Sequence, residues 1–544
     1  MNFRATNRWT ALAVVASLLV GCTSVNPPPS SGGPSATAGA SSSAPPSSPA
    51  ASPSEAPPGP ATFPLAVVTG ITNLRSAISL ADLDDLAARD GLLVPCGIQV
   101  AEPALTAPAD CRPADTVAEW LRGHQGRIAL LPPGLVEPAT KVLSIAGSGP
   151  FGMFGPDLFG DAKARAKDYP ITGTATDAGA LDPAWLAYDP AEVWTLTNIG
   201  SLCADRWAAH QAATLGKGWH WIFNGGTARY AAAAPVDPPV VPPFENAVPV
   251  DPIDTGNAGA VAKLLRRSDV AIADHECPIV PSEDWTPRAI TDPLNVFSVP
   301  EDVLPEWRDF LGLDAVYLAA NHMSDQGVAG VRSTLDLMDE YGVARTGLGM
   351  NLRQALEPTY VDVAGLKIGF VAFNDVAGVQ RAGPGVPGVP WITRRNAIRG
   401  VQLARDGGAD MVICNPQWWG GAEYHDDLWP LQETQLGWFE EAGCDHVIGS
   451  GTHVAGPMLI RQGAHGPSVT LVSPGNFVFG QGWWQEAQEG VILDLTFRGQ
   501  TLVNVRMRPT VQVLAARPSF LDPQAEGSYV LKRIYKYSEL GSAR

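Results

Sequence analysis

The sequence predicts an α/β fold, and two patterns in residues 191–510 lead to that prediction. Apolar runs of strand length alternate with segments whose apolar residues recur three and four positions apart, which is typical of buried strands and amphipathic helices. Late in the chain, GVILDLTF and LVNVRMR follow each other closely and favour an antiparallel pair. Parallel units followed by an antiparallel meander predict a mixed sheet with helices packed against it.

The expected elements follow from these patterns in chain order. The apolar run 315–320 ends in Asn321-His322, and the helix-like segment after it closes at Gly342. Polar residues at a strand end are site candidates, because function in open α/β sheets gathers there. Strands are expected at 193–199, 269–273, 315–320, 367–373, 410–414, 446–449 and 469–473, and helices at 257–267, 327–341, 394–406 and 430–442.

The N-terminus has the pattern of an export signal. Arg4 and Arg8 precede the apolar stretch 11–20, and the segment ends Leu-Val-Gly-Cys at Cys22. A basic start and a short apolar core predict a signal peptide over residues 1–21, too short for a transmembrane span. The last four residues resemble a bacterial lipobox, which implies a lipid on Cys22. A plain cleavable signal is the alternative.

The next segment, residues 22–62, consists almost entirely of Ser, Pro, Ala and Gly. Such a composition buries too little apolar surface to fold, so we expect a disordered tether. A lipid on Cys22 would make the membrane a partner of the protein. The expected location is therefore the outer leaflet of the bacterial cell membrane, outside the cytoplasm.

The charge balance excludes one class of partner. The chain has 37 basic and 55 acidic residues, for a formal net charge of −18 at pH 7. An acidic surface disfavours electrostatic binding of nucleic acid, so no nucleic-acid partner is expected. It also opposes tight capture of a polyanion unless basic residues gather locally.

Residues 63–190 have their own alternation of elements and predict a smaller α/β domain. AVVTGI and IALLP have the pattern of strands, and SLADLDDLAARDG and DTVAEWLRGHQ that of helices. The segment resembles part of the phosphate-type periplasmic binding fold, in which loops at helix starts hold an oxyanion. A small-anion site and a purely structural role both stay open for it. Residues 511–544 are expected to form a C-terminal extension.

Six cysteines remain after Cys22, and an even number in an exported protein permits disulfides. Cys96 and Cys111 share a Pro-rich loop and are expected to pair. Cys203 and Cys277 each follow an expected strand, so adjacent parallel strands would bring them together. The remaining two, Cys414 and Cys444, are expected at opposite edges of a parallel sheet and therefore as free, buried thiols.

Seven sequence blocks resemble the CapA family of poly-γ-glutamate capsule synthesis proteins, which are related to calcineurin-like metallophosphoesterases. The resemblance implies a four-layer α/β/β/α metallophosphoesterase-like sandwich over residues 191–510, preceded by the smaller α/β domain. The blocks, in family order, are IADHECPI (272–279), LAANHMSDQGVAG (318–330), GVARTGLG (342–349), KIGFVAFND (367–375), WWGGAEYH (418–425), CDHVIGSGTHV (444–454) and SPGNFVFGQ (473–481).

The resemblance also implies a set of site residues. Two-metal hydrolases of this class draw ligands from Gly-Asp, Asn-x-Glu, Asn-His, His-Trp-Gly-x-Glu and Gly-His-x-x-His, and the ions activate a water between them. Matching positions in this chain imply catalytic roles for Glu276, His322 and Glu423. They imply metal-binding roles for Asn321 and His453, with His275 as a further nitrogen ligand.

Three positions depart from that pattern. Ser201 stands where the bridging Asp belongs, Gln417 lies where a His is usual, and Ser450 replaces the first His of the Gly-His motif. Neutral groups do not supply the charge that holds a divalent cation or lowers the pKa of its water. The sequence therefore leaves open one divalent metal (Zn, Mn or Fe) on a nitrogen-rich site, or no tightly bound metal.

Aromatic residues crowd the same region. Tandem Trp residues on loops are a common surface for stacking on sugars or flat polymer faces, so Trp418, Trp419, Tyr424 and the nearby Gln417 are expected to bind substrate.

Three functions follow as hypotheses. The first is a CapA-like surface lipoprotein that acts in synthesis, release or anchoring of an extracellular polymer such as poly-γ-glutamate. The second is a metal-dependent hydrolase, against which the missing ligands count. The third is a non-catalytic protein that binds a small anion or a polymer through a degenerate hydrolase site.

Overall fold

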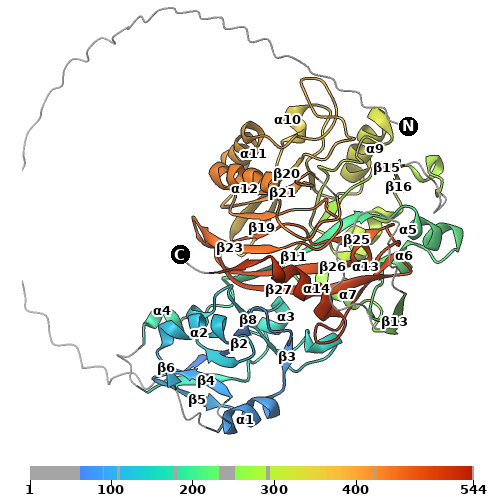
Figure 1. Ribbon diagram of the computed structural model, residues 1–544. Coiled ribbons are helices and arrows are strands. Elements are labelled where there is room, and N and C mark those ends of the chain that lie inside the picture. Colours follow the sequence, from blue (N-terminus) through green and yellow to red (C-terminus); the bar gives the residue numbers. More distant parts are fainter. Residues whose placement is uncertain are drawn as a thin grey trace, which may run out of the picture. The chain divides into compact units, whose positions relative to one another are not determined.

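A computed structural model of the chain describes residues 62–89, 91–106, 111–176, 181–231, 251–288, 295–421 and 423–541 (Figure 1). The predicted signal peptide, the lipid on Cys22 and nearly all of the predicted tether lie outside these residues. Within them, every helix is too short or too polar to cross a membrane. The residues from Thr62 onward belong to one compact unit.

The larger main sheet contains ten strands among the described residues. Its centre is parallel, because β11 pairs in parallel with β14 and β14 with β17. Beyond β11 the sheet is antiparallel through the meander β26, β27 and β28, which confirms the antiparallel pair predicted from the sequence. In order the strands are β13 (Pro252–Gly256), β12 (Thr227–Tyr230), β28 (Arg517–Phe520), β27 (Thr501–Val513), β26 (Glu489–Arg498), β11 (Val193–Cys203), β14 (Val270–His275), β17 (Ala315–Tyr317) and β18 (Arg345–Thr346), and β25 (Asn476–Phe479) also pairs with β11.

The smaller main sheet has seven strands in the described part of the chain. Three consecutive strands, β20, β21 and β22, are parallel, and β24 extends the parallel run. In order the strands are β19 (Thr359–Val363), β20 (Leu366–Asn374), β21 (Met411–Gln417), β22 (His446–Ile448), β24 (Gly466–Leu471), β23 (Met458–Gly463) and β29 (Glu539–Leu540). The predicted C-terminal extension thus contributes β28 to one sheet and β29 to the other.

Alternating side chains along β20 place this sheet between two layers, because successive side chains of a strand point to opposite faces. Phe370 joins a cluster with Leu493 and Leu495 of the larger sheet. Val371 and Phe373 face the opposite way and pack with helices α11 (Arg394–Asp406) and α12 (Pro430–Ala442), which cover the outer face (Figure 1). Helices α6 (Trp219–Phe223) and α7 (Ala260–Leu265) pack against β28 of the larger sheet. The predicted four-layer α/β sandwich is confirmed.

Local signals explain why the helix bounds agree with the sequence prediction. Thr393 caps α11, because its hydroxyl accepts a hydrogen bond from Asn396 N at 3.1 Å. Pro430 occupies the first turn of α12, and Gly443 ends it in the left-handed region with φ of 90°. The remaining helices are α1 (Leu80–Ala88), α2 (Val117–Gly123), α3 (Ala162–Arg165), α4 (Pro183–Leu186), α5 (Trp207–Ala209), α8 (Val303–Pro305), α9 (Gly327–Glu340), α10 (Leu352–Ala355), α13 (Gln485–Gln488) and α14 (Gly527–Lys536).

The N-terminal region forms its own small sheets. The predicted strands AVVTGI and IALLP are β2 and β7, which pair antiparallel, and the two predicted helices are α1 and α2. One sheet has the order β6 (Cys111–Arg112), β4 (Leu92–Pro95), β7 (Ile128–Leu131), β2 (Ala66–Gly70) and β8 (Thr140–Val142); another has β1 (Thr62–Pro64), β10 (Thr172–Ala175) and β5 (Ile98–Glu102). Two short pairs complete the described strands: β3 (Ala77–Ile78) with β9 (Ser144–Ile145), and β15 (Ile279–Val280) with β16 (Val299–Pro300).

Polar contacts join this region to the larger sheet. Asn504 on β27 accepts a hydrogen bond from Val142 N at 3.1 Å, and Thr496 on β26 donates to Phe159 O at 2.8 Å. Arg165 pairs with Asp269 at 2.9 Å, with the arginine side chain 6% exposed. These buried contacts fix the position of the N-terminal region on the sheet, because breaking them would leave desolvated polar groups unpaired.

The structure contains the two disulfides that the sequence predicts and one that it does not. Cys96 pairs with Cys111, and Cys203 with Cys277. The prediction of free thiols at Cys414 and Cys444 is wrong, since these residues are also bonded, with their Cα atoms 5.9 Å apart. Cys414 is the fourth residue of the seven-residue strand β21 and not its end. It therefore lies beside the start of β22, which the chain reaches two residues after Cys444.

Breaking this third bridge should destabilise the fold. It closes a loop with a sequence separation of 30 residues, so the double variant C414S/C444S is expected to lose about 3–4 kcal/mol of unfolding free energy by the chain-entropy relation. Thermal and denaturant unfolding would measure the loss. Thiol titration of the unreduced, unfolded wild type should find none of these six cysteines free. A free pair at 414 and 444 would contradict the bridge.

His446 should make stability depend on acid. Burial lowers its pKa from 6.5 to about 3, with the charge of His465 adding to the effect, and Val469 N donates a hydrogen bond to its Nδ1 at 3.2 Å. Between these two pH values the unfolded chain binds a proton that folded His446 does not, so stability is lost as pH falls below about 6.5. The variant H446N should have a slope shallower by up to about 1.4 kcal/mol per pH unit in denaturant titrations from pH 7 to 4. Parallel curves for the two proteins would contradict this role.

Candidate functional site

The predicted site residues gather where the carboxyl ends of parallel strands from both main sheets meet. Ser201 lies near the end of β11, and Glu276 directly follows β14. The loop after β17 carries Asn321, and β21 ends at Gln417. Gln417 forms a parallel bridge with Ser450, which follows β22. The connection between the two sheets therefore runs through the site itself.

A pair of buried carboxylates forms its centre. Asp274 and Glu276 are two residues apart on β14 and just beyond it, so both side chains point to one face. Ser201 Oγ donates to Glu276 Oε1 at 2.6 Å and lies 3.5 Å from Asp274 Oδ2. The second oxygens, Asp274 Oδ1 and Glu276 Oε2, are buried without a hydrogen-bond partner. Burial, and then the nearby charge of Glu276, raise the pKa of Asp274 well above its usual value, while the nearby hydroxyls of Ser450 and Ser201 oppose the rise. The protonated form of Asp274 is thereby favoured.

His453 lies between two carboxylates. Its Nε2 is 3.4 Å from Glu423 Oε1 and 3.9 Å from Glu276 Oε2. Its Nδ1 is hydrogen-bonded to Asn476 Oδ1 at 2.9 Å, which fixes the ring orientation. Glu423 is the most accessible of these acids, with its side chain 32% exposed. His453 is thus held with one nitrogen facing the acidic groups.

Two neighbouring residues of this site have strained backbones. His453 has a φ of 62° and Tyr424 a φ of 60°, in the left-handed region that costs a non-glycine residue about 1–3 kcal/mol. Their rings lie 5.8 Å apart. Burial, and then the charge of Glu423, raise the pKa of the Tyr424 hydroxyl well above its usual value, so the phenol stays protonated. Strained backbones at two neighbouring residues are typical of functional sites, because the surrounding structure must hold such residues in place.

A pair of side-chain amides lies on the other side of the site. Gln417 Oε1 accepts from Asn321 N at 2.7 Å, and Gln417 Nε2 donates to Asn321 Oδ1 at 3.0 Å. The adjacent His322 pairs through Nδ1 with Asp325 Oδ2 at 2.8 Å, which orients its imidazole. The side-chain amides of Gln417 and Asn321 therefore hydrogen-bond to each other.

His275 is not brought to this group. On β14 its side chain points to the face opposite Asp274 and Glu276, where its ring packs edge-on against Trp307 at 4.7 Å. Its Nδ1 bonds to Leu202 O at 2.7 Å, its Nε2 is buried without a partner, and burial lowers its pKa to about 4. His275 is therefore a neutral core histidine at neutral pH.

The aromatic residues differ from the predicted stacking surface. The expected exposure of Trp418 is wrong, because its ring is fully buried against Phe439 and its Nε1 donates to Val472 O at 2.9 Å. Tyr424 is also buried, and it packs against Trp484 with ring centroids 4.8 Å apart. Trp419 is half-buried. Strand β21 continues to Gln417, so Trp418 follows a buried strand directly and does not begin an open loop.

The residues do not fit the two-metal centre that the resemblance implies. Across the described residues, no three His, Cys, Asp or Glu side chains converge as a metal-binding group. At the three altered positions, Ser201 donates to a carboxylate that a metal would need, Gln417 binds Asn321, and Ser450 places a neutral hydroxyl that is buried without a hydrogen-bond partner. The prediction of one bound divalent ion stays a prediction, and no chemical step is derived through a metal.

Sequence reasoning missed two acidic residues of this site. Asp274 precedes the matched motif and follows an apolar strand, yet its i, i+2 relation to Glu276 was a sufficient signal for a shared face. Asp325 lies three residues after His322 in a loop, where sequence spacing does not indicate contact. The carboxylate of Asp205, four residues after Ser201, accepts from Arg206 N and Ser298 N and is not part of this group.

Comparison with known proteins identifies the region that holds these residues. Residues 246–481 match the family model of the bacterial capsule synthesis protein PGA_cap. In this region the chain is similar to the capsule synthesis family. A capsule biosynthesis protein CapA from Bacillus anthracis is 28% identical over 238 residues, which cover 43% of this chain and 56% of the relative. A PGA biosynthesis protein CapA from Bacillus subtilis is 27% identical over 234 residues, covering 43% and 59%. The matched part thus spans little more than half of each relative.

Solved structures give a weaker likeness. A 5'-nucleotidase precursor from Thermus thermophilus has a TM-score of 0.33 and 12% sequence identity, and the match covers 63% of this chain and 58% of that one. The calcineurin-like phosphoesterase YfkN from Bacillus subtilis has a TM-score of 0.28 and 10% identity, over 63% of this chain and 98% of that one.

Restoring the ligands of the resembled pattern should raise the metal content of the protein. Full-length protein purified without chelator is expected to contain far less than one equivalent of Zn, Mn or Fe. The variant S201D/S450H returns a carboxylate and an imidazole to the acidic centre and should gain close to stoichiometric metal, because charge and nitrogen ligands are what the site lacks. Elemental analysis measures both proteins.

The variant S201A/S450A is the matched control, since it removes the same hydroxyls without adding ligands. It should remain metal-free. Stoichiometric metal in the natural protein would show that its present side chains are sufficient to bind a metal. That result would contradict the conclusion that these residues do not fit a metal centre.

Proposed function

We propose that this protein acts at the bacterial cell surface in the synthesis or anchoring of an extracellular polymer of the poly-γ-glutamate type. One observation carries the proposal: the side chains that converge at the sheet ends, apart from Ser201, lie within the 246–481 match to capsule synthesis proteins. Two relatives matched in that region are named for capsule or PGA biosynthesis. An extracytoplasmic, lipid-anchored location through Cys22 is part of the proposal.

The charges of the site select which part of such a polymer it would hold. Glu276 and Glu423 are acidic side chains, and a polymer of glutamate units carries a carboxylate on every residue. Like charges at close range repel, so the body of the polymer is disfavoured there. The amino end of the chain is its one cationic group. Buried carboxylate oxygens without partners are suited to an ammonium group, because charge-assisted hydrogen bonds are the strongest that uncoordinated oxygens can form.

We therefore assign the site to the amino end of the polymer. Glu423, as the most exposed acid, would receive the ammonium group first, with His453 Nε2 beside it. His453 is placed to take up or return a proton at that nitrogen, because its ring is fixed by Asn476 and its free side faces the acids. His322, held by Asp325, is the second imidazole near the entrance, with its side chain 17% exposed.

The metal-dependent hydrolase is the less favoured function. It requires charged ligands that this chain replaces at Ser201, Gln417 and Ser450. Binding of a polymer end uses the same carboxylates without needing a metal, and we propose that the protein works without a tightly bound one.

The proposal is tested by surface polymer and by binding. Deleting the gene in the source organism should remove most cell-associated glutamate polymer, measured as glutamate after acid hydrolysis of washed cells. In vitro, full-length protein should bind γ-linked glutamate oligomers with a free amino end at least about tenfold more tightly than the N-acetylated oligomers, because acetylation removes the charge of the hydrogen-bond donor. The variant E423Q should lose that preference.

The variant E433Q on the exposed face of α12 is the matched control and should behave as wild type. An unchanged amount of surface polymer in the deletion strain would contradict the proposed biosynthetic role. Equal affinity for free and acetylated oligomers would remove the assignment of the amino end while leaving that role untouched.

A further inference from the structure

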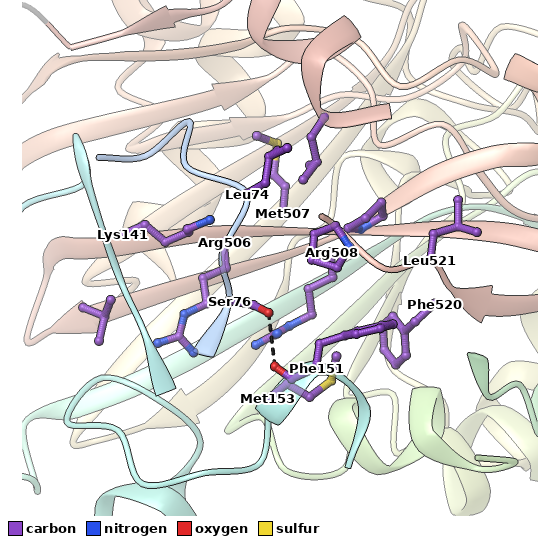
Figure 2. A pocket seen from close by; sticks show the side chains of 14 residues that line it. Leu74, Ser76, Lys141, Phe151, Met153, Arg506, Met507, Arg508, Phe520 and Leu521 are labelled. Atoms are coloured by element: carbon purple, nitrogen blue, oxygen red, sulfur yellow. Dashed lines mark hydrogen bonds between the residues drawn. The ribbon is translucent and has the colours of Figure 1, made fainter. Parts of the chain in front are cut away.

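A small, partly open cavity lies at the junction between the N-terminal region and strand β27, away from the site described above (Figure 2). The N-terminal region contributes Leu74, Ser76 and residues of β8, and the larger sheet contributes residues of β27 and β28. Leu531 of α14 completes one wall. None of the residues gathered at the sheet ends lines this cavity.

The lining has an unusual charge for so acidic a protein. Lys141, Arg506 and Arg508 all face the cavity, and its lining, taken over the described residues, contains no carboxylate. Arg506 pairs with Asp157 and Arg508 with Asp494, both outside the lining. The charges of Arg506 and Arg508 are thus balanced by carboxylates outside the lining, and the third basic side chain of the cavity has no such carboxylate.

That third cation is Lys141. Its ammonium donates to Asn73 O, and in the part of the chain that the structure describes no carboxylate forms an ion pair with it. The residue is only 8% exposed, so two of its three N–H donors have little access to water. Burial, and then the charges of Arg506 and Arg508, lower the pKa of Lys141 to about 7. A buried ammonium without a counter-ion is costly, and a bound anion would remove that cost.

The rest of the wall is apolar. Phe520, Leu521 and Leu531 line the cavity together with Met507. Figure 2 shows Phe520, Leu521 and Met507 with the three basic side chains around the same space. An inorganic anion would satisfy the basic groups but would leave this apolar surface without a partner. A ligand with an anionic head and a short apolar body satisfies both.

We propose that this cavity binds a small organic acid, with its carboxylate against Lys141, Arg506 and Arg508 and its apolar body against Phe520, Leu521 and Leu531. With Lys141 protonated, the cavity carries a single net positive charge, which matches one carboxylate. The site is independent of the polymer-end assignment, because the two share no residue. The proposal thus gives the N-terminal region a part in binding a small organic acid.

Calorimetric titration of the full-length protein with acetate, butyrate and butyramide at constant ionic strength tests the proposal. Butyrate should bind more tightly than acetate by on the order of tenfold, since each buried methylene group contributes about fourfold. Butyramide, which has the same body without the charge, should not bind measurably. The variant K141M, which keeps the side-chain volume, should weaken butyrate binding by tenfold or more.

The variant K167M replaces an exposed lysine of the same region and should bind butyrate as wild type does. K141M should also keep or raise the thermal midpoint of the ligand-free protein, because it removes an unpaired buried charge. Equal binding of butyrate and butyramide, or unchanged butyrate affinity in K141M, overturns the proposal. Binding of inorganic phosphate without butyrate overturns the organic-acid assignment. The comparison of butyrate with butyramide needs no variant, so it decides the matter even if K141M fails to fold.

Discussion

The candidate site depends on the hydrogen bonds that Gln417 makes between the two main sheets. Its side chain holds the backbone and the amide of Asn321 from the larger sheet, while its own backbone bridges to Ser450 in the smaller one. In a two-metal hydrolase the ions would bind ligands from both sheets. Here a neutral amide makes that connection. The strands therefore converge through an amide–amide contact at this point.

Without a metal, the buried carboxylates of the acidic centre need another partner. Asp274 and Glu276 sit together in a buried place, with one oxygen of each lacking a partner. Two close carboxylates need a proton or a cation between them, and the two serines supply only hydroxyl donors. Among the described residues, the nearest basic side chain is that of His453, 3.9 Å from Glu276, so an incoming ammonium group could bind to the unpaired oxygen of Glu276. This requirement is what connects the geometry to an amino end.

Much of the architecture was predictable because local signals and the long-range arrangement agree. Helices α11 and α12 begin and end where Thr393, Pro430 and Gly443 indicate, and the apolar runs became the parallel strands. The errors have a common cause, which is the length of β21. A strand ended too early by the sequence pattern placed Cys414 at an edge and Trp418 on an open loop. Strand ends are poorly specified by sequence, because a polar residue such as Gln417 can continue a strand when another part of the chain satisfies its side chain.

The site residues were harder to assign than the fold for a related reason. A sequence motif indicates which residues match a site but not where their side chains point. The alternation of side chains along β14 places His275 on one face of the sheet and Asp274 and Glu276 on the other. The basic cavity had no sequence signal at all, since Lys141 and Arg506 come from regions hundreds of residues apart. Both sites nevertheless contact one strand. β27 carries Arg506 and Arg508 and also Gln512, whose Oε1 accepts from Phe479 N on β25, the strand that begins at Asn476. A protein with a large negative charge thus keeps an acidic site and a basic one apart at different positions of the same sheet, and each can select a ligand of opposite charge without neutralising the other.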